Sequence, residues 1–201
     1  MSIAYNRSMS PAPARTSNDA IVAAARRILE TDGLSEVTMR SVAEAVGVQG
    51  PSLYKRVPDH AALLRAVAEG VVADLARTLA GAVETDDPRA DLRATVLAYR
   101  AFVRANPNGY RLLFADLPAG ASPDPASLAA LGDPIVRAMA RLAGEADALE
   151  GARTIVAWAH GFVTMELAGA FRLGGDLDAA YAFGIGSILA GVSASAIPAS
   201  R

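Results

Sequence analysis

The sequence contains no cysteine among its 201 residues, which excludes a disulfide framework and thiol chemistry. Histidine occurs only as His60 and His160, and neither has a cluster of acidic residues around it, so we expect no histidine-based metal site. The first residues have no apolar run after a basic start, so a secretory signal is not expected either. A reducing cytoplasm is the compartment that these absences favour.

Aromatic residues are also scarce, at 5% of the chain, and much of the 52% hydrophobic content is alanine. Alanine is the best helix former, whereas strands need β-branched and aromatic residues, so the composition predicts an all-α protein. The net charge is −2, so the protein is not coated in basic charge. Any binding to nucleic acid must therefore depend on local positive charge.

Short helices are predicted in the first third of the chain, because apolar residues recur there at helical spacing between residues that cap or end helices. The first helix ends at Gly33, the second opens at Thr38 and ends at Gly47, and the third has Pro51 near its first position. A longer helix follows at about 59–79. These patterns predict three domain-level segments: a disordered tail at 1–15, a three-helix domain at 16–62 and a larger helical region at 63–198.

In the larger region, helical patterns are separated by segments rich in proline and glycine. They bring the expected total to about nine helices, and they lie at about 88–105, 107–117, 124–143, 148–172 and 176–196.

The last of these patterns has no charge between residues 178 and 201, and its length alone would permit a membrane span. Alanine, glycine and serine dominate it, however, and only six of the twenty residues 179–198 are Val, Ile, Leu or Phe. Such a composition gives a weak drive for membrane insertion, whereas small residues let two helices approach closely. We therefore expect a buried dimerisation helix, paired with the helix at 148–172 in a four-helix interface, and no membrane contact.

The most informative segment is 37–64, which reads VTMRSVAEAVGVQGPSLYKRVPDHAALL. It predicts two short amphipathic helices joined by a tight turn and followed by a third. The second helix carries an outward set of Ser52, Tyr54, Lys55 and Arg56. A helix-turn-helix presents side chains to the DNA major groove in this way.

The order of these signals resembles the TetR family of transcriptional regulators. The resemblance is carried by a helix ending in Gly33, then TMRSVAEAVGV, then Leu53-Tyr54, then a Pro-Asp-His-x-x-Leu-Leu start to the next helix. Its motifs cover about residues 17–65, and the remainder matches only in length and helix count. The resemblance implies a regulator and not an enzyme: a homodimer, most often a repressor, that binds a palindromic double-stranded DNA operator without a cofactor. A small-molecule effector would bind the larger region and release the repressor from its operator.

The resemblance also implies DNA contacts for individual residues. Thr38 would cap its helix and meet a phosphate, Tyr54 would bond a phosphate, and Arg40 would reach a base edge or a phosphate. The chain departs from the family's common residues at His60, where lysine is usual, and at Arg56, where an aromatic residue often stands, and Gly50 has no side chain to contact a base. We expect operator specificity to depend on such positions. The full set expected at DNA is Thr38, Arg40, Gln49, Pro51, Ser52, Tyr54, Lys55, Arg56 and His60.

A second set of residues, mostly apolar, is expected to line an effector pocket, which favours a hydrophobic or weakly polar effector. The segment from Trp158 to Gly161 resembles the Trp-x-His-Gly signature of one subgroup of TetR C-terminal domains. Its aromatic stripe also fits plain core packing, and His160 also fits a structural role. The candidate pocket residues are Tyr99, Phe102, Val103, Tyr110, Phe114, Met139, Trp158, Phe162 and Met165.

Two other functions are compatible with a helical protein of this size. One is an enzyme that uses a helical cavity, with His160 and Glu166 as an acid–base pair; six residues separate them, so they do not stack on one helix face. The other is a ligand-binding or partner-binding helical protein without DNA binding. Two basic residues in the expected recognition helix argue against it.

Overall fold

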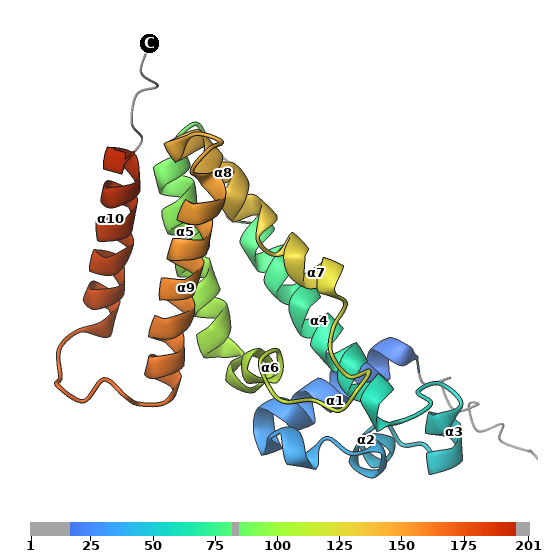
Figure 1. The fold of residues 1–201 in the computed structure, drawn as a ribbon. Coiled ribbons are helices and arrows are strands. Elements are labelled where there is room, and N and C mark those ends of the chain that lie inside the picture. Colours follow the sequence, from blue (N-terminus) through green and yellow to red (C-terminus); the bar gives the residue numbers. More distant parts are fainter. Residues whose placement is uncertain (1–16, 82–84, 196–201) are drawn as a thin grey trace, which may run out of the picture.

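The computed structural model describes residues 17–81 and 85–195, and every regular element within those ranges is a helix. The all-α class predicted from composition is therefore confirmed. The tail predicted at 1–15 lies outside the described residues. Figure 1 shows α1, α2 and α3 gathered at one end of the molecule, with α4 running from them towards α8.

The N-terminal elements are α1 (Asn18–Asp32), the short 3-10 helix η1 (Leu34–Glu36), α2 (Met39–Ala45) and α3 (Gly50–Tyr54). Local signals determine their limits. The Ser17 hydroxyl accepts a hydrogen bond from Ala20 N at 3.1 Å, and Thr38 and Ser41 cap α2 reciprocally. Gly47 follows α2 with a φ of 71°, a left-handed conformation that glycine adopts without strain.

These helices enclose a small apolar core. Ile21 and Leu29 of α1 meet Val42 of α2 and Leu53 of α3, and all four are at most 1% exposed. The start of α4 completes this core with Leu63. Because α3 places only Leu53 in the core, the rest of this short helix faces solvent.

The larger region continues with α4 to α10. The element bounds are α4 (His60–Ala80), α5 (Pro88–Ala105), α6 (Pro107–Leu112), α7 (Pro125–Ala130), α8 (Asp133–Ala143), α9 (Ala148–Leu167) and α10 (Leu177–Ser195). Residue 62 therefore lies inside α4. This helix packs against the first core near Leu63, and further along it forms a separate small apolar cluster of Val71, Leu75 and Leu79 with Phe102 of α5. The domain boundary expected at 62/63 stays a prediction.

One predicted helix proved to be two. The pattern at 124–143 is divided into α7 and α8 around Gly132. Pro134 explains the division, because proline has no N–H to donate and its ring would clash with the carbonyl of Ala130 in a continuous helix. The helices predicted at 107–117 and 148–172 also end early, at Leu112 and Leu167.

The second large core lies between α5, α8, α9 and α10. The inner face of α10 contributes Tyr181, Ile185 and Leu189, spaced four residues apart and at most 2% exposed. An ion-pair network around a buried arginine links three of these helices: Arg100 of α5, 5% exposed, contacts Glu166 of α9 at 2.7 Å and Asp178 of α10 at 2.8 Å. Within the described ranges, no helix is long and apolar enough to cross a membrane.

Candidate nucleic-acid interface and internal cavity

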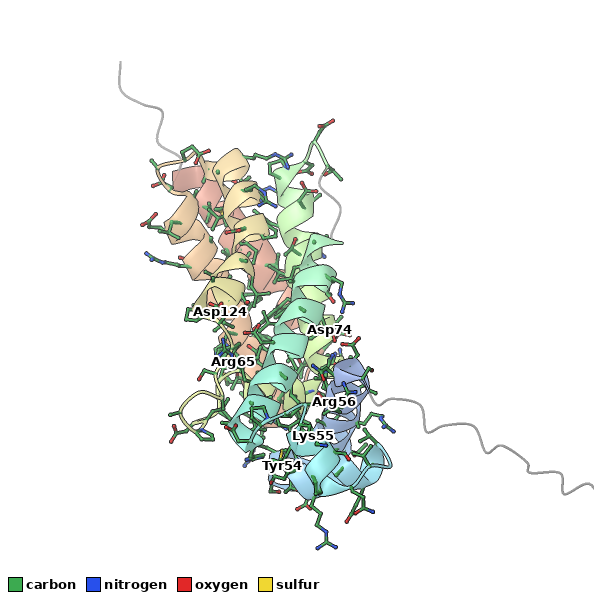
Figure 2. The ribbon with its side chains drawn as sticks, turned by 90° about the vertical axis from the view of Figure 1, so that its right-hand side faces the viewer. Tyr54, Lys55, Arg56, Arg65, Asp74 and Asp124 are labelled. Atoms are coloured by element: carbon green, nitrogen blue, oxygen red, sulfur yellow. The ribbon has the colours of Figure 1, made fainter. Side chains whose placement is uncertain are left out.

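The expected DNA-binding residues lie together at the α2–α3 end of the molecule. Figure 2 shows Tyr54, Lys55 and Arg56 close to one another at that end. All three are exposed, and Lys55 and Arg56 have no ion-pair partner among the described residues. Two neighbouring cations without acidic partners are available to phosphates.

A shallow groove joins α2 to α3. It has a volume of about 340 Å³, and Arg40, Gln49 and Tyr54 are among the residues that line it. Arg40 is largely exposed and pairs with Glu44 one turn later at 2.9 Å. An exposed pair of this kind contributes little to stability, so Arg40 can exchange Glu44 for a phosphate at small cost.

Thr38 and His60 already have partners in the free protein. The Thr38 hydroxyl accepts from Ser41 N at 3.0 Å, and the Thr38 N–H donates to Ser41 Oγ at 3.0 Å. His60 Nε2 lies 2.6 Å from the carbonyl oxygen of Val37. A carbonyl can only accept, so Nε2 carries the hydrogen and His60 fixes the start of α4 against the segment before α2.

A cavity of about 640 Å³ lies between α4, α5, α6, α7, α8 and α9. Its lining is predominantly apolar, with a few polar side chains. The residues are Leu75, Leu79, Thr95, Val96, Tyr99, Tyr110, Leu113, Phe114, Leu128, Ala129, Leu131, Gly132, Ile135, Arg153, Val156, Ala157, Ala159 and His160.

Three of the nine expected pocket residues line this cavity: Tyr99, Tyr110 and Phe114. The other six lie outside the cavity lining. Phe102 packs against the cluster of α4 side chains, and Val103 and Met139 are fully buried in the second core. Met165 is 46% exposed at the surface.

Trp158 and Phe162 miss the cavity because their side of α9 faces α10. The Trp158 ring stacks on Tyr181 with a centroid distance of 4.9 Å, and Phe162 meets the same tyrosine at 4.9 Å. The cavity instead receives another side of α9, including Arg153, Val156 and His160. The sequence contained one indication that this side of α9 is shared by polar residues. Arg153 and His160 are two helical turns apart, so they lie on the same side of the helix.

A polar chain crosses part of the cavity wall. Tyr99 is hydrogen-bonded to Tyr110, whose hydroxyl lies 2.5 Å from Nδ1 of His160. Burial raises the pKa of both tyrosines, so they remain neutral phenols. Glu166, the acid–base partner considered for His160, is bonded to Arg100 instead, so the two residues form no catalytic pair.

The cavity wall is connected to α1 through the start of α6. The Glu30 carboxylate of α1 accepts from Gly109 N at 2.8 Å and from Asn108 N at 3.1 Å. The Asn108 side chain in turn donates to the backbone carbonyls of Leu29 and Glu30, both at 3.1 Å. Tyr110, the next residue of α6, lines the cavity.

Two family models match the chain. Residues 21–67 match the bacterial regulatory proteins of the tetR family, and residues 92–188 match the tetracyclin repressor-like C-terminal domain. A helix-turn-helix transcriptional regulator of Mycobacterium tuberculosis, described as uncharacterised, is 32% identical over 165 residues, covering 78% of this chain and 73% of that protein.

Solved structures give the same result. A Rhodococcus protein of unknown function has a TM-score of 0.77 and 25% identity, covering 93% of this chain and all of that one. A TetR variant from Acinetobacter baumannii in complex with minocycline has a TM-score of 0.67 and 27% identity, covering 90% of this chain and 99% of that one. The matched families are regulators and not enzymes. With its N-terminal DNA-binding helices and helical C-terminal region, this chain belongs to the TetR family of transcriptional regulators.

Proposed function

We propose that this protein is a homodimeric repressor that binds a palindromic DNA operator and leaves it when a small, largely hydrophobic effector enters the cavity. The observation that carries the proposal is the short path from the cavity to the DNA-binding helices. Tyr110 lines the cavity, and the two residues before it are bonded to Glu30 of α1. An effector that moves α6 therefore acts on α1 through existing hydrogen bonds. Effector binding in the cavity and operator binding at the DNA-binding helices are then coupled, and each lowers the affinity for the other by the same factor.

On the operator, α3 is the recognition helix in the major groove. Lys55 and Arg56 provide unpaired positive charge, and each contact of such a side chain with a guanine edge contributes about 1–3 kcal/mol of discrimination. Arg40, Gln49 and Tyr54, which share the α2–α3 groove, contact phosphates or base edges beside it. His60 acts by holding α4 in position through Val37.

The effector part of the proposal is supported by the cavity and by a relative. A volume of about 640 Å³ lies within the range that drug-sized ligands occupy. The 27% identical TetR variant from Acinetobacter baumannii is in complex with minocycline, which supports a small-molecule ligand in this chain without identifying it.

The test is a gel-shift and footprint assay on the DNA that flanks the protein's own gene, with and without candidate effectors. We expect a specific complex whose affinity falls steeply with salt, because phosphate contacts release counterions. Lys55→Ala and Tyr54→Phe should each weaken the complex, by roughly fivefold or more, since each removes a contact to the DNA.

Arg172→Ala is the matched control, because this exposed arginine lies between α9 and α10, outside the α2–α3 end. It should leave operator affinity unchanged. The absence of any specific complex, with no effect of Lys55→Ala or Tyr54→Phe, would contradict the proposal and favour a ligand-binding protein without DNA binding.

A further inference from the structure

The cavity has an uneven distribution of charge. Among the described residues that line it there is no aspartate or glutamate, whereas Arg153 lies at its exposed edge. Arg153 has no ion-pair or hydrogen-bond partner in the described ranges, although Glu150 lies one turn earlier on α9. An arginine at the mouth of an apolar cavity, unneutralised by the protein, provides a site for an anionic group.

The inner polar groups do not oppose an anion. Tyr99 and Tyr110 are neutral phenols, and an imidazole such as that of His160 carries no negative charge. The two hydroxyls and Nδ1 of His160 are bonded to one another, so this polar chain adds no negative charge to the cavity. The remaining wall is apolar, and its larger side chains are Leu75, Leu79, Leu113, Leu128, Ile135 and Val156.

The two polar regions are separated along one helix. Arg153 and His160 are seven residues apart on α9 and both line the cavity, so they lie on one side of the helix, about 10 Å apart along its axis. A ligand that reaches both has an apolar body of that length with an anionic group at one end.

We propose that the effector is an amphipathic monocarboxylate, with its apolar body inside the cavity and its carboxylate on the guanidinium of Arg153. This inference rests on the proposed effector function and specifies the chemical class of the ligand. The planar guanidinium matches a carboxylate through two parallel hydrogen bonds. The edge of the cavity is also where a carboxylate loses least hydration, because an ionised group without a partner is costly to bury.

The test is calorimetric titration of the full-length, DNA-free protein with octanoate, decanoate, decan-1-ol and decylamine. We expect decanoate to bind at least about tenfold more tightly than the alcohol or the amine of the same chain length, because hydrogen bonds to charged groups are the stronger ones. Arg153→Gln should weaken binding of both carboxylates by about tenfold and leave the alcohol unchanged. Arg153→Lys should retain part of the preference for decanoate over decan-1-ol. Lysine keeps the positive charge but lacks the planar guanidinium that forms two parallel hydrogen bonds with a carboxylate.

Arg93→Gln is the matched control: Arg93 is an exposed arginine of α5 that does not line the cavity, and its loss should not change carboxylate binding. Equal affinity for decanoate and decan-1-ol, equal weakening of both by Arg153→Gln, or no binding of either carboxylate would each overturn the inference. A separate gel shift without ligand tests the proposed function. A protein that binds its operator but does not select carboxylates disproves only the ligand class, and one that selects carboxylates but binds no DNA disproves only the repressor function.

Discussion

At the scale of single residues, Gly184 determines how closely α10 approaches α9. A Cβ at this position would overlap the indole ring of Trp158, which stacks on Tyr181 of the same helix. Glycine normally weakens a helix interior, by roughly 0.5–1 kcal/mol relative to alanine. Here that cost is offset by the close packing of Trp158 against α10.

Gly184→Ala should therefore lower the free energy of unfolding, by about 1–3 kcal/mol, because the indole must leave its stacked position. Gly70→Ala provides the contrast. Its added Cβ would meet Val22 at an ordinary 3.5 Å, so the better helix propensity of alanine should raise the free energy of unfolding by about 0.5–1 kcal/mol. Urea denaturation at one fixed protein concentration measures both. Equal effects of the two substitutions would show that the Trp158 contact does not control the packing.

At the scale of elements, α6 is the short helix through which the cavity meets α1. Two backbone N–H groups at its start donate to the Glu30 carboxylate, and Gly109 leaves no room for a side chain, since a Cβ there would lie 2.8 Å from Glu30 Oε1 and 3.1 Å from Val71. The junction is therefore tightly fitted, and we expect a displacement of Tyr110 to reach Glu30 through it.

Glu30→Ala should uncouple effector binding from DNA binding. The variant leaves two N–H groups without their acceptor, which costs about 1 kcal/mol or more of stability. The ratio of operator affinities without and with effector should fall towards one, while effector affinity changes little. Gel shifts across an effector titration measure that ratio. Glu145→Ala, at an exposed residue between α8 and α9, should keep the full ratio; an unchanged ratio in Glu30→Ala would rule out this junction as the path.

At the scale of the whole molecule, the outer face of α10 is the surface on which we expect a second protomer. Its inner face is buried against α5, α8 and α9, but Phe183 remains 76% exposed among small residues, and Met165 of α9 is 46% exposed. The small residues allow a helix of a second protomer to approach closely, and the Phe183 ring can then be buried at the centre of the contact. A central aromatic side chain of this kind is typical of a stable interface.

Phe183→Glu should convert a dimer into a monomer, because it places a charge where apolar surface would be buried. Sedimentation measures the change, and operator affinity should fall with it, since two half-sites need two linked recognition helices. Leu128→Glu introduces the same charge at another exposed apolar residue, on α7, and should leave the mass unchanged. If Phe183→Glu remains a dimer, protomers associate through a different surface.

Much of this molecule follows from local signals. Thr38 caps α2, Gly47 ends it, and Leu53 enters the first core as their spacing predicts, because caps, positive φ angles and helical periodicity act within a few residues. The break between α7 and α8 also has a local cause, in Gly132 and Pro134. It was not predicted, because the apolar residues on both sides of the break follow one continuous helical pattern.

The tertiary structure alone decided which side of α9 faces the cavity. The helix carries apolar residues around most of its circumference, so periodicity does not tell whether Trp158 or His160 lines the cavity. Packing of α10 against Trp158 settles the orientation and turns Arg153 and His160 towards α4 and α5. The sequence thus determined the family, the helices and the DNA-binding end through short-range chemistry. The cavity wall and its link to Glu30 depend on contacts between residues far apart in the chain, 50 residues for Tyr110 and His160 and 79 for Glu30 and Gly109, which no local pattern specifies.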